Sequence, residues 1–451
     1  MSSLFTAEEN RLLTETDAGT PMGDLMRRYW FPAFLSERLP EPGGDPMAIT
    51  LLGEELVAFR ASDGRIGLMD RYCPHRQASL ALARVDEDCS IRCIYHGWKI
   101  NVEGKVLETP PEPPNSRFAQ SIKFPVYPTR EAAGMVWTYM GPKDLEPPFP
   151  EFPFNSLPEE NVWANHFYQP SNWLQGLEGD VDAGHAGYLH YSFELWDEMV
   201  KTQEKGTKFL FDPRPLTEVE PMPWGLQTMF RFALEDPAEA TFWVHPFVMP
   251  FYTMFGLSEG DVPSGGLMHA WVPTTNGGHY VYSVFWNNDG PLTPQQRAAI
   301  DKGQKFTDVD PDNGYRSSKW TGSEYVQDRQ AMRERSSFSG YDGVHLQDLA
   351  VQHSMGAIVD RTRENLGAED FLVIQVRRFM LNALKQMEAG ETLPALQDGM
   401  DHRSIPHRQI VGPADTPLRE MMQRTEFPVN ASAADDNWAP SATAWSPLPK
   451  V

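Results

Sequence analysis

Two short segments of the chain each offer one cysteine and one histidine. The pattern is Cys73-x-His75, then seventeen residues, then Cys93-x-x-His96. A redox pair normally has adjacent cysteines as CxxC, and Cys-x-His is shorter than the common zinc knuckle. A Rieske [2Fe–2S] cluster takes two cysteines on one iron and two histidines on the other. Each of two facing loops must then supply one of each, so the pattern favours a Rieske cluster over zinc.

A second group of possible ligands lies in "NWLQGLEGDVDAGHAGYLHYS", which starts at residue 172. On a regular helix, which turns about 100° per residue, Glu178, Asp182 and His185 share one face and His190 lies well off it. If both histidines bind one metal, the helix must break between them. Gly184 and Gly187 give the backbone that freedom.

Two histidines and one carboxylate form the facial triad of mononuclear non-haem iron, which leaves positions open for O2 and substrate. The spacing leaves two choices for the carboxylate: Asp182, next to the histidines, or Asp348 in "GVHLQDLAVQHSMG". If the chain had no cluster motif upstream, His185 and His190 would be interpreted as ordinary surface histidines. Because the cluster motif is present, an oxygen-activating iron is the natural acceptor of the cluster's electrons.

The elements that must position these residues follow from the residue pattern. Short β-branched and aromatic runs separated by Gly, Asp and Asn turns predict an all-β domain over 45–141. A capped entry and a short helix precede it at 16–30, and a Pro-rich linker follows it near 155. We expect a helical stretch in 162–192, strands in 215–290, and a long helical region in 343–392 with its first helix ending at Gly367. The expected division is 1–155, 156–392, and a Pro/Ala/Asp-rich tail at 393–451.

Composition narrows the class of protein. The 451 residues are 41% hydrophobic and 22% charged, as in ordinary globular proteins. The net charge of −23 argues against nucleic acid and anionic membrane surfaces. There is no apolar run long enough to cross a membrane and no secretory signal. Three cysteines fit a reducing compartment, so a cytoplasmic location is expected, and Cys89 is a spare thiol.

With both metal motifs in order, the chain resembles the α-subunit of a Rieske non-haem iron aromatic-ring oxygenase, closest to the phthalate dioxygenase-like group. Segments such as "LLGEELVAFRASDGRIGLMDRYCPHR", "CIYHGWKINVEGKVLETP", "NWLQGLEGDVDAGHAGYLH" and "QDLAVQHSMGAIVDRTRENLG" carry the likeness over most of the chain. The resemblance implies an α+β fold, with an N-terminal all-β Rieske domain and a C-terminal helix-grip (START-like) catalytic domain.

The resemblance also assigns roles. It makes Cys73, His75, Cys93 and His96 the [2Fe–2S] ligands, and His185, His190 and Asp348 the ligands of mononuclear Fe(II). It makes Asp182 the bridge that passes electrons from a neighbouring subunit's cluster histidine to an iron histidine.

The activity implied is the oxygenase component of a multicomponent system. It would use O2 and NADH-derived electrons, delivered by a separate flavin/[2Fe–2S] reductase, in a homotrimer or a multiple of one. We expect hydroxylation of an aromatic compound in aromatic catabolism, with ring dihydroxylation of an aromatic carboxylate first. The alternatives are a monooxygenase or O-demethylase of a methoxylated aromatic, and a non-catalytic Rieske electron carrier.

Candidate substrate residues come from the 215–290 region. Its aromatic residues suit an aromatic ring, although in strands they more often form plain core; they include Trp224, Phe230, Trp243, Phe247, Phe251 and Trp286. Arg231 lies where phthalate-like relatives place basic residues, and it could hold a carboxylate bidentately. One departure is Gln77, where the family more commonly has glycine.

Overall fold

The computed structural model describes residues 4–113, 115–190, 214–234, 236–257 and 263–423. The chain starts with two short helices, α1 (Ala7–Thr14) and α2 (Pro21–Met26). Thr6 and Glu9 form a capping box on α1, and Thr20 caps α2, which has proline at its first position. The short capped helix expected within 16–30 is therefore confirmed.

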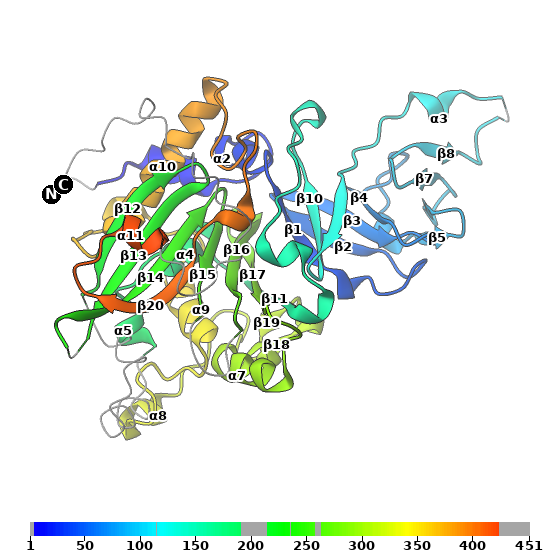
Figure 1. Ribbon diagram of the computed structural model, residues 1–451. Coiled ribbons are helices and arrows are strands. Elements are labelled where there is room, and N and C mark those ends of the chain that lie inside the picture. Colours follow the sequence, from blue (N-terminus) through cyan, green and yellow to red (C-terminus); the bar gives the residue numbers. More distant parts are fainter. Residues whose placement is uncertain (1–3, 114, 191–213, 235, 258–262, 424–451) are drawn as a thin grey trace.

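The N-terminal β domain contains three antiparallel sheets (Figure 1). The first has the order β1–β10–β9, the second β2–β3–β4 and the third β5–β6–β7–β8. Their bounds are β1 (Trp30–Leu35), β2 (Met47–Leu51), β3 (Glu54–Arg60), β4 (Ile66–Asp70), β5 (Arg84–Asp86), β6 (Ser90–Arg92), β7 (Lys99–Asn101), β8 (Val106–Glu108), β9 (Thr129–Ala132) and β10 (Met135–Tyr139). A single turn of helix, α3 (Phe118–Ser121), lies beyond β8. The strand pattern predicted for 45–141 is confirmed.

The C-terminal domain is built on one eight-stranded antiparallel sheet. Its strand order is β11–β17–β16–β15–β14–β13–β12, and β20 also pairs with β14. The bounds are β11 (Val162–Gln169), β12 (Leu216–Met222), β13 (Gly225–Ala233), β14 (Glu239–Val248), β15 (Tyr252–Phe255), β16 (Gly266–Thr275), β17 (Gly278–Trp286) and β20 (Arg408–Pro413). The strands expected in 215–290 are confirmed.

Helices cover one face of this sheet, which completes the α+β helix-grip architecture (Figure 1). They are α4 (Trp173–Asp180), α5 (Ala186–Leu189), α9 (Val344–Ser354) and α10 (Phe371–Glu388). The outlying elements are α7 (Pro294–Gln304), α8 (Arg329–Glu334), α11 (Leu418–Gln423) and the two-residue pair β18 (Val309–Asp310) and β19 (Arg316–Ser317).

The helical stretch expected within 162–192 is confirmed by α4 and α5. Strand β11 precedes them at 162–169, and all eight of its residues pair with β17. One helical expectation needs correction. The helix that carries Asp348 ends at Ser354 rather than at Gly367, and Gly356 follows with φ of 94°. A left-handed glycine just past a helix end is the usual stop signal, and it occurs earlier than expected.

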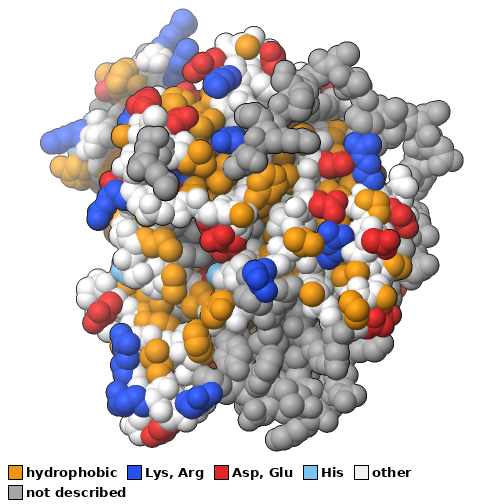
Figure 2. Space-filling view, turned by 90° about the vertical axis from the view of Figure 1, so that its left-hand side faces the viewer, with side chains coloured by type: hydrophobic (Ala, Val, Ile, Leu, Met, Phe, Trp, Pro, Cys, Tyr) orange, Lys and Arg blue, Asp and Glu red, His pale blue; other side chains and the backbone are white. Residues whose placement is uncertain are grey.

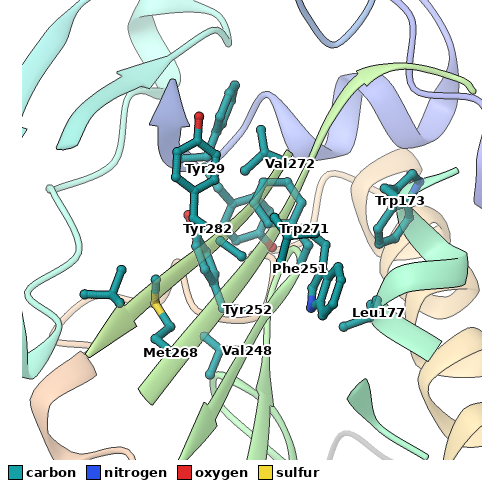
Figure 3. Packing of buried hydrophobic residues seen from close by; sticks show 14 of the residues in the cluster. Tyr29, Trp173, Leu177, Val248, Phe251, Tyr252, Met268, Trp271, Val272 and Tyr282 are labelled. Carbon is teal, nitrogen blue, oxygen red and sulfur yellow. The ribbon is translucent and has the colours of Figure 1, made fainter. Parts of the chain in front are cut away.

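The main core joins the N-terminal segment to the C-terminal sheet. Figure 3 shows Tyr29 beside sheet residues such as Tyr252, and Trp271 facing Leu177 of α4. Gly176 permits this close approach, because a Cβ there would lie 2.4 Å from the ring of Trp271. The packing therefore fixes α4 against β16.

The segment assigned to the tail is partly built into the sheet. Strand β20 pairs with residues 239–244 of β14, and α11 packs with the outer-face cluster that includes Met229 and Phe242. Residues 424–451 lie outside the described part of the chain.

The surface shows no segregation of charge on the face seen in Figure 2, where acidic and basic side chains are scattered among hydrophobic ones. Among the described residues, no helix combines the length and the apolar character that a membrane crossing needs.

Candidate metal centres

The two Cys/His segments form two loops with the same backbone hydrogen bonds. In the first loop, Cys73 N–H donates to Ala78 O (2.9 Å) and Gln77 N–H donates to Cys73 O (3.0 Å). In the second, Cys93 N–H donates to the carbonyl of residue 98 (2.9 Å) and Gly97 N–H to Cys93 O (3.0 Å). Each loop thus curls around its own cysteine, which presents the two thiols in equivalent ways.

This equivalence accounts for the unusual Gln77. Gln77 and Gly97 occupy matching places in the two loops, and both have positive φ, 57° and 72°. Only glycine adopts this region without strain, so the backbone itself favours glycine at position 77. The Gln77 side chain is exposed, and its amide donates to Cys73 O at 3.4 Å.

The donor set fits a Rieske cluster. Both thiols are buried, and burial, with the Cys93 sulfur adding, raises the pKa of Cys73 to about 11. The rings of His75 and His96 lie 4.4 Å apart, and His75 stacks on Trp98 at 4.8 Å. The buried Nδ1 of His75 has no hydrogen-bond partner in the part of the chain that the structure describes. A metal ligated there would take up this nitrogen and hold the thiols as thiolates.

Cys89 stands apart from this group. Its thiol lies 3.3 Å from the Ser62 hydroxyl on a neighbouring turn. The expected role of a spare thiol agrees with that position.

The second group brings three side chains from two distant segments together. His185 Nε2 lies 3.2 Å from His190 Nε2, and each lies 3.6 Å from a carboxylate oxygen of Asp348. The three side chains are between 14% and 25% exposed, so solvent and small molecules can reach them. Two imidazoles and one carboxylate aimed at one point fit the facial triad of mononuclear iron.

The chain breaks its helix where the histidine spacing requires it. Helix α4 ends at Asp180, α5 starts at Ala186, and His185 and His190 flank α5 at its two ends. Of the two candidate carboxylates, Asp348 faces both Nε2 atoms. Asp182 instead lies behind His185, with its Oδ2 3.4 Å from His185 Nδ1.

Each triad histidine has a second polar group on its outer nitrogen. His190 Nδ1 lies 2.7 Å from Gln347 Oε1. The Gln347 amide nitrogen donates to Ser339 Oγ (3.0 Å) and Tyr341 O (3.3 Å), which turns the amide oxygen toward His190. His190 Nδ1 must then carry the proton, and Nε2 keeps its lone pair for a metal. The sequence signal for Gln347 was only its place beside Asp348.

The charges of the triad depend on one another. Burial lowers the pKa of His185, but Asp182 and Asp348 outweigh it and raise that pKa to about 9. Burial raises the pKa of Asp348 despite the nearby His190 and His185. A divalent ion bound by His185 Nε2, His190 Nε2 and Asp348 would take the place of a proton there and compensate the charge of Asp348.

Glu178 shares the sequence segment but not the metal site. Its carboxylate binds two buried arginines, with Arg361 Nη2 at 2.7 Å and Arg377 Nε at 2.6 Å. Arg377 also binds Glu364 at 2.6 Å. This network fastens α4 to α10 and to the segment after α9, and so holds the helix end that leads to Asp182.

Arg231 does not face the metal site. Along β13, Phe230 and Phe232 belong to the main core, whereas Met229 belongs to the cluster on the opposite face. Because side chains alternate along a strand, Arg231 lies on the Met229 face. Its guanidinium donates to Ala414 O at 2.8 Å, and its expected carboxylate-binding role stays a prediction that this position does not favour.

The aromatic candidates divide between the two faces. Phe230, Trp243 and Phe247 lie on the helix-covered face with the main core. Trp286 packs instead against Phe154 and Phe251 against Phe31, away from the triad. Trp224 is buried at the turn between β12 and β13, where its carbonyl accepts from Met249 N–H. Its suggested substrate contact stays a prediction.

Sequence reasoning missed three polar residues beside the triad: Asp180, His245 and His269. Asp180 lies two residues before Asp182 but points to the sheet, where His269 Nδ1 lies 3.0 Å from its Oδ1 and the Thr253 hydroxyl also donates to it. Alternating polar residues in aromatic strands were the only available signal.

Comparisons with known proteins agree with these two centres. Residues 29–128 match the Rieske [2Fe-2S] domain family, and residues 138–435 match the LigXa C-terminal domain like family. The oxygenase subunit of phthalate 4,5-dioxygenase from Pseudomonas putida is 36% identical, over 90% of this chain and 91% of that protein. The oxygenase subunit of 3-chlorobenzoate-3,4-dioxygenase from Comamonas testosteroni is 34% identical, over 88% and 93%.

Two further similarities bear on reaction type and fold. The oxygenase subunit of 5,5'-dehydrodivanillate O-demethylase from Sphingobium sp. (strain NBRC 103272 / SYK-6) is 30% identical, over 90% of this chain and 88% of that protein. A crystal structure of dicamba monooxygenase shares the fold, with a TM-score of 0.54 and 18% identity over 81% of this chain and 99% of that chain.

Cluster loops, metal triad and full-length relatives together lead to one conclusion: the chain belongs to the Rieske non-haem iron oxygenases, as an oxygenase-component chain with a [2Fe–2S] cluster and a mononuclear iron.

Proposed function

We propose that the chain dihydroxylates the ring of an aromatic carboxylate, with electrons that reach it from NADH through a flavin/[2Fe–2S] reductase. The observation that carries this proposal is the triad of His185, His190 and Asp348 in a chain alike over most of its length to two aromatic-acid dioxygenase subunits. When bound, the iron supplies oxygen activation and the cluster supplies electrons.

The residues of the chain orient these groups. Cys73, Cys93, His75 and His96 would hold the cluster, and the triad would hold the iron. Gln347 fixes the tautomer of His190 through its amide oxygen. Asp182 holds the outer nitrogen of His185 and gives that ring a polar contact away from the iron.

Electron transfer is proposed to run between subunits, in a homotrimer or a multiple of one. In Figure 1 the loops beside β5 to β8 stand at the far right of the view, whereas α4 and α9 stand within the other domain, to the left. Electrons from a chain's own cluster would have to cross both domains. A cluster supplied by a neighbouring copy, docked near Asp182, shortens that path.

The test is product formation with a reductase, NADH and O2. Phthalate and 3-chlorobenzoate are offered as acids, and methoxybenzoates as demethylation substrates. A cis-dihydrodiol from an acid, with NADH consumed in proportion, supports the proposal. NADH oxidation without any oxygenated aromatic acid contradicts it.

O-demethylation is the second candidate, and the 30% identical O-demethylase subunit favours it. Oxygen inserted at an O-methyl carbon releases formaldehyde. Formaldehyde from methoxybenzoates, without diols from any acid, would replace the first proposal with this one.

A further inference from the structure

Two buried histidines on the helix-covered face of the sheet have ring nitrogens without a partner. His245 on β14 is 1% exposed, and neither of its nitrogens has a hydrogen-bond partner among the described residues. His269 on β16 is 7% exposed; its Nδ1 faces Asp180, and its Nε2 has no such partner. Buried polar atoms are nearly always paired, so these nitrogens call for a ligand or a water.

Aromatic rings surround the two histidines. The ring of Phe255 lies between them, with centroids 4.1 Å from His245 and 5.6 Å from His269. Phe230 lies 5.8 Å from His245, and Trp243 lies 6.2 Å from Phe255. Flat apolar walls with a few polar atoms are typical of a site for an aromatic ligand.

The same residues lie close to the metal triad. The ring of His269 is 5.6 Å from that of His345, which precedes Asp348 by one turn on α9. Asp180, which holds His269, ends the helix that leads to Asp182 and His185. The charges of Asp180 and His269 are near enough to influence the pKa of Asp348.

We propose that His245 and His269 are the specificity-determining contacts of the substrate, and that they bind the carboxylate of an aromatic acid whose ring packs beside Phe255. This inference rests on the proposed function and deepens it, because it places acid recognition on histidines rather than on Arg231.

The chemistry of the two rings suits a carboxylate. Burial lowers the pKa of His245 to about 4, so its neutral ring carries one N–H that can donate. His269 meets Asp180 through Nδ1, so an acid bound at Nε2 would make it a bridge between two carboxylates. An acid at Nε2 accepts a hydrogen bond when that nitrogen carries hydrogen, so both N–H groups of the ring would then donate. Asp180 is then a positioning residue for His269.

His166 provides a matched control. It is 3% exposed and its ring nitrogens also lack a hydrogen-bond partner among the residues described, yet it stacks on Tyr282 and packs against Tyr315 on the opposite face. Burial and unpaired nitrogens are thus shared, and only His245 and His269 face the aromatic walls beside the triad.

The experiment compares an acid with its uncharged amide. Affinities for 3-chlorobenzoate and 3-chlorobenzamide are measured anaerobically by calorimetry with the metal-loaded protein. His245→Phe and His269→Phe should weaken acid binding about tenfold or more, the value of a lost hydrogen bond to a charged group, and amide binding much less. His166→Phe should leave the acid-to-amide ratio unchanged.

Two further variants keep the test decisive if a phenylalanine variant misfolds. His245→Gln retains an N–H donor and should keep part of the acid preference. Asp180→Asn should raise KM for the acid more than it lowers kcat, with iron content unchanged. If the wild type turns over an aromatic acid but the His245 and His269 variants keep its acid-to-amide affinity ratio, the inference is overturned. Absence of turnover with every aromatic acid in the wild type would instead overturn the proposed function.

Discussion

Asp182 Oδ2 lies 3.4 Å from His185 Nδ1, whereas the other nitrogen of that ring faces Asp348 Oδ1 at 3.6 Å. One imidazole therefore joins a carboxylate in the triad to a carboxylate outside it. A group in this position can affect electron delivery without being a metal ligand.

Asp182→Asn should leave the metals in place and lower turnover. The amide keeps the size of the side chain but removes the charge behind His185. Loss of an outer partner of a metal histidine typically costs about 10–100-fold in activity. Steady-state kcat and iron per chain are the two measurements. An unchanged kcat would show that electron transfer does not depend on the Asp182 carboxylate.

Asp348→Ala should remove the mononuclear iron and leave the [2Fe–2S] cluster in place. The wild-type chain is expected to hold three irons, and the variant two, because the cluster loops lie in the other domain. Iron analysis and the cluster's visible spectrum measure this. The exposed Asp312→Ala serves as the control and should keep three irons. Loss of the cluster spectrum in the Asp348 variant would contradict independent centres.

Glu178→Gln should destabilise the protein and make its free energy of unfolding less dependent on pH in the acidic range. Burial alone would raise the pKa of Glu178, but Arg361 and Arg377 outweigh it and lower that pKa below its ordinary value of 4.5. The carboxylate therefore stabilises the fold above about pH 4.5, and this stability is lost as the pH falls from there toward the lowered pKa.

Breaking a buried ion pair typically costs about 3–5 kcal/mol. Denaturant unfolding between pH 3 and pH 7 measures the effect of Glu178→Gln. Glu8→Gln is the control, since its pair with Arg11 is solvent-exposed and contributes little. Equal losses in the two variants would contradict a special role for the buried network.

Variants of Gln77 can distinguish the effect of its positive φ from any effect of its side chain. Gln77→Gly should remove the cost of a side chain at positive φ, about 1–2 kcal/mol, and add about 0.5–1 kcal/mol of unfolded-state entropy. Gln77→Ala retains the strain. We expect stability changes within about 1 kcal/mol and an unchanged cluster potential in both. A shifted potential or altered reductase kinetics in both would show that the glutamine side chain itself matters.

Arg231→Ala should affect the C-terminal segment rather than the substrate. The guanidinium bonds to Ala414 O beyond β20, so its loss should cost about 1 kcal/mol of stability. KM for an aromatic acid should stay the same. Arg419→Ala, at a 74% exposed side chain, is the control for loss of positive charge. A raised KM in the Arg231 variant alone would restore its substrate role.

The sequence was most informative where chemistry fixes the spacing. Cys73, His75, Cys93 and His96 could be grouped because a cluster needs paired donors from two loops. The break between His185 and His190 followed from helix geometry. Asp348 could be chosen over Asp182 only by resemblance, since the distance along the chain does not tell which carboxylate faces the histidines.

The sequence was least informative where tertiary packing decides. The place of strand β11 within 162–192 depends on β17, which offers a partner along its length. Arg231 and Phe230 are neighbours in sequence but face opposite sides of the sheet, and which side faces the triad depends on the helices that cover it. His245 and His269 were hidden because a histidine in an aromatic strand reads as core until its neighbours are known.

Strand β20 gives the end of the chain a role in completing the fold. One edge of β14 pairs with β13, and among the described residues the other edge pairs at 239–244 with residues 408–413. During synthesis, that edge stays open until nearly the whole chain has been made, and an open edge invites pairing with other chains. The C-terminal segment thus protects the sheet from aggregation. A chain that ended before β20 would carry both metal motifs and still expose an unpaired strand edge.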